Sequence, residues 1–264
     1  MCVLLGGIRY VLLDSDVMDV FFGFGIMVVN PINPLSTAPE IEAQVAALKD
    51  HPGLLMYSLG NEWNYNGLYA SRSPAEAAAA VRTASEAIRT VDPHCPIATI
   101  YGEVPTAALV ESLPCIDVWG LNVYRSDTFG DLFGAWEGIS TKPLFLGEFG
   151  ADAFNALPEV NAYDPGSQAE ATERLGTEIN SNSVLYSQTG VASGGFVFEW
   201  ADEYWKAGDN WAQDTGGVAP GGGPFPDSTF NEEYWGLVTI DRQTRPAYAA
   251  YAALRSPPAW PHIN

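Results

Sequence analysis

The chain has 264 residues, 47% of them hydrophobic, and its 12 basic against 32 acidic side chains give a formal charge of −20 at pH 7. This length and composition allow a sizeable core in one large domain or two small ones, and the negative charge argues against nucleic acid or an anionic membrane as a partner. An acidic surface keeps a protein soluble, and it is compatible with a secreted or extracellular location or with a salty habitat.

Neither metal binding nor membrane insertion is predicted. The cysteines, Cys2, Cys95 and Cys115, form no CxxC pair and the three histidines are scattered, so no metal site is expected. An odd number of cysteines does not suggest a disulfide framework, although a bond between Cys95 and Cys115 stays open. No run of about 18 apolar residues predicts a membrane span. The apolar start MCVLLGGIRYVLL lacks the basic region and cleavage site of a signal peptide.

Short apolar runs alternate with longer segments that have helical spacing. After a short strand or strand remnant at 2–6 and a helix at 10–24, the expected strands lie at 25–30, 54–60, 96–101, 116–124, 143–149 and 194–200. The expected helices lie at 37–50, 74–91, 105–112, 128–138, 168–188 and 244–254. The helix at 74–91 has the clearest start signal, with Ser73 as N-cap, Pro74 as first residue and Glu76 completing a capping box. Residues 201–235, rich in Gly, Trp and Asp, are expected to form a long loop.

This alternation predicts parallel strands with helices outside them. Apolar strands without polar alternation suit a sheet that is covered on both faces, which is either an open doubly wound sheet or a (β/α)8 barrel. No glycine-rich dinucleotide or phosphate loop follows any strand, which argues against the nucleotide-binding form of the open sheet. We therefore predict an α/β TIM-type barrel that forms one catalytic domain over residues 1–264. Six strands are clear, which leaves open whether the barrel is complete at its N-terminus.

Polar side chains recur where the expected strands end, which is where barrel enzymes carry their reactive residues. The residues at these ends are Asn61, Glu62, Glu103, Asn122, Tyr124, Glu148 and Glu199. Two carboxyl groups at one rim suit cleavage of a glycosidic bond, because one protonates the leaving oxygen while the other attacks the anomeric carbon or activates water. Taken alone, Glu62 is explained equally well as a buried structural glutamate paired with an arginine.

Four segments together resemble the clan A glycoside hydrolases, which include families 2 and 5 with β-glucanases, mannanases and β-galactosidases. They are LGNEW at 59–63, LNVY at 121–124, KPLFLGEFG at 142–150 and FVFEW at 196–200. The resemblance covers about residues 25–254 in the expected order. It implies a retaining mechanism that needs no cofactor, with Glu62 as general acid and base and Glu148 as nucleophile.

The resemblance also implies roles for neighbouring residues. Asn61 corresponds to an asparagine that bonds the sugar 2-hydroxyl, Tyr124 to a tyrosine that steadies the nucleophile, and Trp200 to the aromatic platform under the sugar. If the last strand alternates, Trp200 points inward and Glu199 outward. Clan members usually carry an arginine from an early strand that bonds the nucleophile, and Arg9 is the only early arginine here.

Further aromatic and polar residues near the strand ends complete the expected substrate contacts. Asn122, Trp63 and Trp205 are predicted to contact sugar, and loop packing is the alternative for these tryptophans as for Trp211 and Trp235. The expected partner is an oligo- or polysaccharide, and a β-linked glucan or related oligosaccharide is the expected substrate. A transglycosylase with the same residues and a catalytically weak carbohydrate-binding remnant are the alternatives. A homo-oligomer whose neighbour completes open sheet edges is a further possibility.

Overall fold

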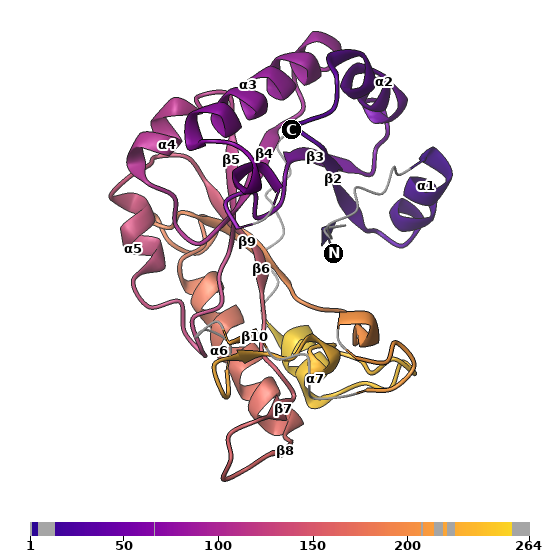
Figure 1. Cartoon of the computed structure of the whole chain (residues 1–264), viewed down its shortest axis with the longest axis vertical. Helices are drawn as coiled ribbons and strands as arrows, with labels where there is room; N and C mark the ends of the chain where they lie inside the picture. The colour runs from indigo at the N-terminus through magenta and orange to yellow at the C-terminus, as the bar shows by residue number, and fades with distance from the viewer. Residues whose placement is uncertain are drawn as a thin grey trace. The chain divides into compact units, whose positions relative to one another are not determined.

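The strands of this computed structural model form a parallel sheet of the predicted kind. The structure describes residues 2–4, 14–65, 67–206, 208–213, 219–220 and 225–254, with backbone only at 2–4 and 219–220. The seven-stranded sheet has the order β1 (Cys2–Leu4), β2 (Met27–Ile32), β3 (Leu54–Leu59), β4 (Ile97–Gly102), β5 (Val118–Asn122), β6 (Leu144–Phe149) and β9 (Ala192–Val197). The pairings from β1 through β5 are parallel. Helices separate the strands from β1 through β9, which confirms the α/β barrel-type fold (Figure 1).

The chain divides into two compact units, which are described separately. The N-terminal unit comprises Met1–Asn122 and Ala135–Gly147, and the C-terminal unit comprises Val123–Gly134 and Glu148–Asn264. The division passes through β6, so that strand contributes its first residues to one unit and Glu148 and Phe149 to the other.

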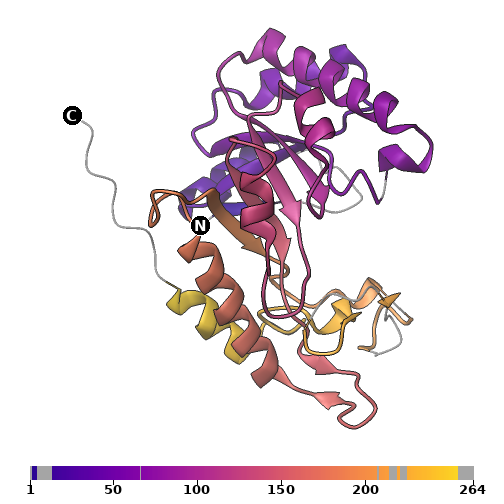
Figure 2. The ribbon, with the colours of Figure 1, turned by 90° about the vertical axis from the view of Figure 1, so that its left-hand side faces the viewer.

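In the N-terminal unit, helices pack along strands β2 to β5. They are α1 (Ser15–Gly23), α2 (Ala38–Leu48), α3 (Pro74–Val91), α4 (Ala107–Ser112) and α5 (Leu132–Glu137), the last beginning in the C-terminal unit. Figures 1 and 2 show α2, α3 and α4 along one side of these strands. The start of α3 is as predicted, because Ser73 N donates to Glu76 Oε2 at 2.9 Å and Glu76 N donates to Ser73 Oγ at 3.4 Å. Such reciprocal bonds satisfy amide groups that the first helical turn leaves free.

In the C-terminal unit, α6 (Pro165–Ser181) and α7 (Pro246–Ala253) lie side by side (Figure 2). A buried ion pair fixes the chain between β9 and α7, since Arg245 Nη2 lies 2.8 Å from Asp202 Oδ2. Gly150 permits another close approach, because a Cβ at this position would lie 2.0 Å from the carbonyl oxygen of Phe198. The segments after β6 and β9 are therefore held against each other by backbone contact.

Several expected boundaries are wrong. Helix α6 runs over Pro165–Ser181 rather than 168–188, because Asp164 caps it and Pro165 occupies its first position. Strand β9 ends at Val197 rather than at residue 200. Beyond that point Glu199 pairs elsewhere, since its N–H donates to Trp235 O at 3.4 Å and its carbonyl accepts from Leu237 N at 2.8 Å.

The expected long loop also contains short elements. These are the 3-10 turns η2 (Tyr204–Lys206) and η3 (Glu232–Tyr234) and the antiparallel pair β10 (Ala219–Pro220) and β11 (Thr229–Phe230). A second antiparallel pair, β7 (Phe154–Asn155) and β8 (Ala162–Tyr163), was not expected.

Two elements are described in the N-terminal part of the chain, β1 and α1. The expected helix at 10–24 is α1, Ser15–Gly23, whose N-cap Asp14 accepts from Val17 N at 2.9 Å, while 10–13 lie outside the described residues. The expected strand or remnant at 2–6 is the strand β1, which pairs in parallel with β2.

Candidate active site

The turn after β3 holds Asn61 and Glu62 in a constrained backbone. Gly60 has φ of +77° and Glu62 has φ of +44°, so both lie in the left-handed region. A glutamate rarely adopts this conformation, and such positions recur at functional sites. The amide of Asn61 is oriented by the end of β5, because Asn122 Nδ2 donates to Asn61 Oδ1 at 3.1 Å.

Trp63 anchors this turn through a hydrogen bond and ring packing. Its side chain is only 1% exposed, and its indole Nε1 donates to Thr99 Oγ1 at 2.9 Å. The rings of Tyr69 and Tyr101 pack against it at centroid distances of 5.3 and 5.0 Å. Loop packing, the alternative for this tryptophan, therefore describes Trp63, which leaves no exposed ring face for a sugar.

Asn122 is buried at the end of β5. A glycine in the neighbouring strand β6, Gly147, leaves room for the Asn122 side chain. A Cβ on Gly147 would lie 2.5 Å from Asn122 Oδ1. Gly147 directly precedes Glu148 in the sequence. The motif LGEF thus combines a position that accommodates the Asn122 amide with the carboxylate predicted to be the nucleophile.

In the C-terminal unit, Glu148 is held by Tyr124. The phenol hydroxyl donates to Glu148 Oε2 at 3.0 Å, and Val123 N donates to the backbone carbonyl of Glu148 at 3.0 Å. A hydroxyl donor stabilises the negative charge that an attacking carboxylate must carry.

Two aromatic rings fix the Tyr124 side chain. Its ring meets Phe230 at 5.3 Å and Trp235 at 5.1 Å, both edge to face. Phe230 and Trp235 are themselves stacked at 5.6 Å with an interplanar angle of 17°. This packing keeps the hydroxyl directed at Glu148.

A second group of side chains follows β9, and we call it the Phe198 cluster: Phe198, Glu199, Glu203, Lys206 and Glu232. Lys206 Nζ lies 5.7 Å from the centroid of the Phe198 ring. It pairs with Glu203 Oε2 at 3.3 Å and also contacts Glu232. Burial, and secondarily the charge of Glu203, raises the pKa of Glu199 to about 11. Glu199 therefore holds its proton at neutral pH.

The cluster adjoins the Tyr124 pair through Trp235. The Phe198 ring lies 5.8 Å from Trp235, and Trp235 lies 5.1 Å from Tyr124. Phe198 N also donates to Phe149 O at 2.7 Å, which joins the chain after Glu148 to the chain after β9.

The expected orientations at the end of β9 are reversed. Glu199 is 7% exposed and Trp200 is 51% exposed, and the Trp200 ring packs against Tyr248 of α7 at 6.0 Å. Because β9 ends at Val197, the inward and outward alternation of side chains along a strand does not extend to residues 199 and 200. Sequence reasoning consequently missed Phe198 and Lys206, and the aromatic residue within FVFEW was the available signal.

The other tryptophans of the last segment differ in exposure. Trp205, in η2, is 58% exposed and Trp211 is 91% exposed, whereas Trp235 is buried at 1%. The packing alternative thus describes Trp235, while Trp205 and Trp211 present free ring surface.

Further findings concern the cysteines, Arg9, metal ligands and helix length. Cys95 and Cys115 are free thiols, so the disulfide left open between them is not formed. Arg9 lies outside the described residues. Over the described ranges, no group of three or more His, Cys, Asp or Glu side chains could hold a metal ion. None of the helices in this part of the chain is long and apolar enough to cross a membrane.

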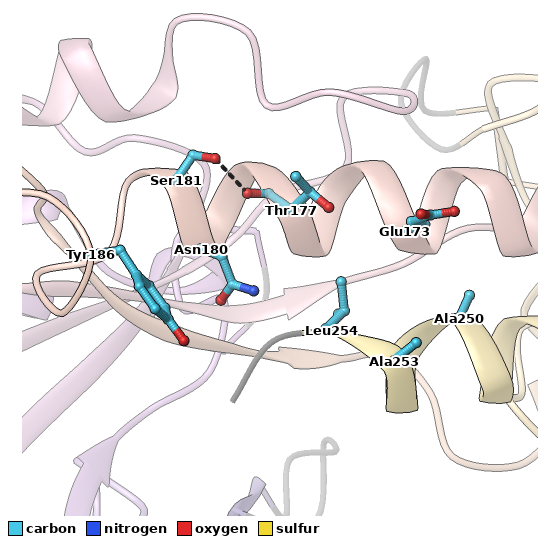
Figure 3. Close-up of a pocket in the computed structure, with 8 residues that line it drawn as sticks. All are labelled: Glu173, Thr177, Asn180, Ser181, Tyr186, Ala250, Ala253 and Leu254. Carbon is cyan, nitrogen blue, oxygen red and sulfur yellow. Dashed lines mark hydrogen bonds between the residues drawn. The ribbon is translucent and has the colours of Figure 1, made fainter. Parts of the chain in front are cut away.

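A cavity of about 360 Å³ lies between α6, α7 and the segment before β9 (Figure 3). It is lined by Glu173, Thr177, Asn180, Ser181, Tyr186, Ala250, Ala253 and Leu254. Ser181 and Tyr186 precede β9, on the N-terminal side of that strand. Barrel enzymes react at the C-terminal ends of strands, so this cavity is separate from the residues around Glu148.

A family profile described as "Glycosyl hydrolases family 2, TIM barrel domain" matches residues 24–257. The chain belongs to this family. Membership confirms the resemblance to clan A glycoside hydrolases and the barrel fold. No curated protein matches the chain in sequence.

Solved structures of similar fold include family 2 enzymes and a family 5 relative. A β-D-glucuronidase from Dictyoglomus thermophilum matches with a TM-score of 0.60 at 18% identity, over 96% of this chain and 45% of that chain. A family 2 β-galacturonidase from Eisenbergiella tayi, bound to galacturonate, gives 0.58 at 17% identity, over 91% and 43%. A GH5_18 protein from Streptomyces cattleya, in complex with GlcNAc, gives 0.58 at 18%, over 90% and 63%. At these identities the likeness shows the fold, and this family 2 chain spans less than two thirds of each of these proteins.

Proposed function

We propose that this family 2 barrel, taken as one catalytic domain over residues 1–264, is a retaining β-glycoside hydrolase. It would cleave a β-linked glucan or related oligosaccharide by double displacement. The observation that carries the proposal is the hydrogen bond from the Tyr124 hydroxyl to Glu148, at 3.0 Å. A carboxylate with a fixed hydroxyl donor at the end of a barrel strand is suited to act as a nucleophile.

In the first step, Glu148 attacks the anomeric carbon while Glu62 gives its proton to the glycosidic oxygen. The bond from that carbon to the leaving oxygen breaks, and a glycosyl ester on Glu148 forms. In the second step, Glu62 takes a proton from water and the water oxygen attacks the same carbon, which releases the sugar and restores both carboxyl groups. This chemistry requires the two carboxyl groups to lie about 5–5.5 Å apart.

Neighbouring residues have supporting roles in this proposal. Asn61, oriented by Asn122, would bond the sugar 2-hydroxyl. Trp205 has an exposed ring on which the C–H face of a sugar can pack, whereas the Trp200 ring packs against Tyr248.

The test compares Glu148→Gln and Glu62→Gln with the control Glu111→Gln, an exposed carboxylate on α4. On para-nitrophenyl β-D-glucoside and on cello-oligosaccharides, we expect turnover to fall at least about 1,000-fold in both catalytic variants and to stay unchanged in the control. Proton NMR of the first-formed product should show the β-anomer. An α-anomer, or activity that survives in Glu148→Gln, would contradict the mechanism. Tight sugar binding without turnover in the unmodified protein would instead support the carbohydrate-binding alternative, and products longer than the substrate would support a transglycosylase.

A uronide is the alternative substrate class, because two of the similar structures are described as a β-D-glucuronidase and a β-galacturonidase. Para-nitrophenyl β-D-glucuronide therefore belongs in the same assay.

A further inference from the structure

Four basic side chains in the described part of the C-terminal unit, namely Arg125, Arg174, Lys206 and Arg245, are paired with acidic partners. The pairs include Arg125–Asp131 at 2.9 Å, Arg174–Glu170 at 3.4 Å, Lys206–Glu203 at 3.3 Å and Arg245–Asp202 at 2.8 Å, and Arg174 also pairs with Asp127 and Lys206 with Glu232. Arg242 donates to the carbonyl of Ile240. A substrate carboxylate that bound one of the four paired cations would compete with the acidic partner already in place.

Lys206 is the cation that lies beside Phe198, and it is matched by more than one acid. Glu203 and Glu232 both contact its ammonium group. Two carboxylates against one lysine leave the neighbourhood negative, and Glu148 lies beyond Trp235 and Tyr124 in the same unit. A like charge brought next to such a group is repelled.

Glu199 supplies a second and independent observation. Its side chain is 7% exposed, and its Oε1 has no hydrogen-bond partner among the described residues. A buried polar atom without a partner is costly and uncommon, which indicates that a ligand or water completes it. A sugar hydroxyl can both donate and accept a hydrogen bond, so it can bind Glu199 Oε1 whether the proton is on that oxygen or on the other carboxyl oxygen.

We propose that the Phe198 cluster makes this enzyme select an uncharged glycoside and reject a uronide. Glu203 and Glu232 neutralise Lys206, the cation that lies beside Phe198, and Glu199 offers its free oxygen to a sugar hydroxyl. A uronate carboxylate only accepts hydrogen bonds, so it would have to compete with Glu203 and Glu232 for the Lys206 ammonium group that both of them contact. This inference rests on the proposed function and names the substrate class of the same site.

The experiment compares para-nitrophenyl β-D-glucoside with the corresponding β-D-glucuronide. We expect the unmodified protein to prefer the glucoside by at least about 100-fold in kcat/KM. In Glu203→Gln/Glu232→Gln, which frees Lys206, the relative kcat/KM for the glucuronide should rise at least about tenfold. The control Glu159→Gln/Glu173→Gln changes the net charge equally at exposed positions of the same unit and should leave the ratio as it was.

Binding separates a failure of this inference from a failure of the proposed function. If neither substrate turns over, binding of cellobiose and of its uronate analogue to the unmodified protein decides, and stronger binding of the neutral sugar supports the inference. If the uronide is turned over or bound as well as the neutral sugar, or better, the inference is wrong while the hydrolase mechanism stands. A selectivity ratio that does not move in the double variant, or that moves equally in the control, would also overturn it, as would binding of neither sugar.

Discussion

Replacing Tyr124 by phenylalanine tests the contact on which the proposed nucleophile depends. The substitution removes only the hydroxyl that donates to Glu148 Oε2 at 3.0 Å. The phenyl ring of the variant would keep its place between Phe230 and Trp235, whose centroids lie 5.3 and 5.1 Å from the Tyr124 ring. The fold should therefore be retained while the nucleophile loses its donor.

The expected loss follows from the charge of the acceptor. A hydrogen bond to a charged group contributes ~1.5–3 kcal/mol, which corresponds to about 10- to 150-fold in rate. The negative charge of the Glu148 carboxylate is lost when the glycosyl ester forms, so the hydroxyl acts on the chemical step. We therefore expect kcat/KM for para-nitrophenyl β-D-glucoside to fall by a larger factor than KM changes. Steady-state kinetics measures the effect, and thermal unfolding followed by circular dichroism checks the fold.

A matched control is Tyr186→Phe, which removes a phenol hydroxyl at the cavity beside α6. It should retain kcat/KM within about twofold. If Tyr124→Phe were equally active with an unchanged unfolding temperature, the hydroxyl would have no part in preparing Glu148, and the reasoning would fail.

Two further predictions concern stability. Trp63→Phe should lower the free energy of unfolding by about 2–4 kcal/mol, because it removes the hydrogen bond to Thr99 and leaves a cavity at a side chain that is 1% exposed. Urea unfolding measures this loss. The control Trp211→Phe, at a residue that is 91% exposed, should change the free energy of unfolding by less than ~0.5 kcal/mol. Burial raises the pKa of Asp152 to about 8, so the native state holds a proton that the unfolded chain releases near pH 4. Stability should therefore fall between about pH 4 and pH 8, by up to ~1.4 kcal/mol per pH unit from this group. Asp152→Asn, which keeps an acceptor for Phe154 N, should show a shallower decline, and identical pH profiles would contradict the assignment.

Local chemistry made much of the fold predictable from sequence. Apolar runs mark β2 to β6 because these strands are buried, and their core residues include Val28, Val29, Leu59 and Leu121. The start of α3 is encoded within four residues by its capping box. Elements of this kind depend on neighbours in the chain, so a single sequence contains the information.

The end of β9 shows where local reasoning fails. Whether Glu199 or Trp200 points inward depends on where the strand stops, and Glu199 leaves the ladder because Trp235 and Leu237 supply its backbone partners. Those partners lie far along the chain, in a segment with no regular pattern. Trp63 presents the same difficulty, since its burial depends on Thr99 of another strand.

The sequence predicts candidate catalytic groups, but the contacts that position them become visible only in the tertiary structure. Asn61 and Glu148 are each oriented by a side chain from the segment LNVY, the former by Asn122 and the latter by Tyr124. These two residues are separated by Val123 alone, whose N–H also bonds the Glu148 carbonyl. The segment carries no carboxylate, and its contribution is to orient Asn61 and to supply a hydroxyl donor to Glu148. The segment LNVY holds one contact in each unit, Asn122 with Asn61 and Tyr124 with Glu148. A backbone shift in this segment would disturb both contacts, whereas a substitution of Asn122 or of Tyr124 would disturb only its own contact.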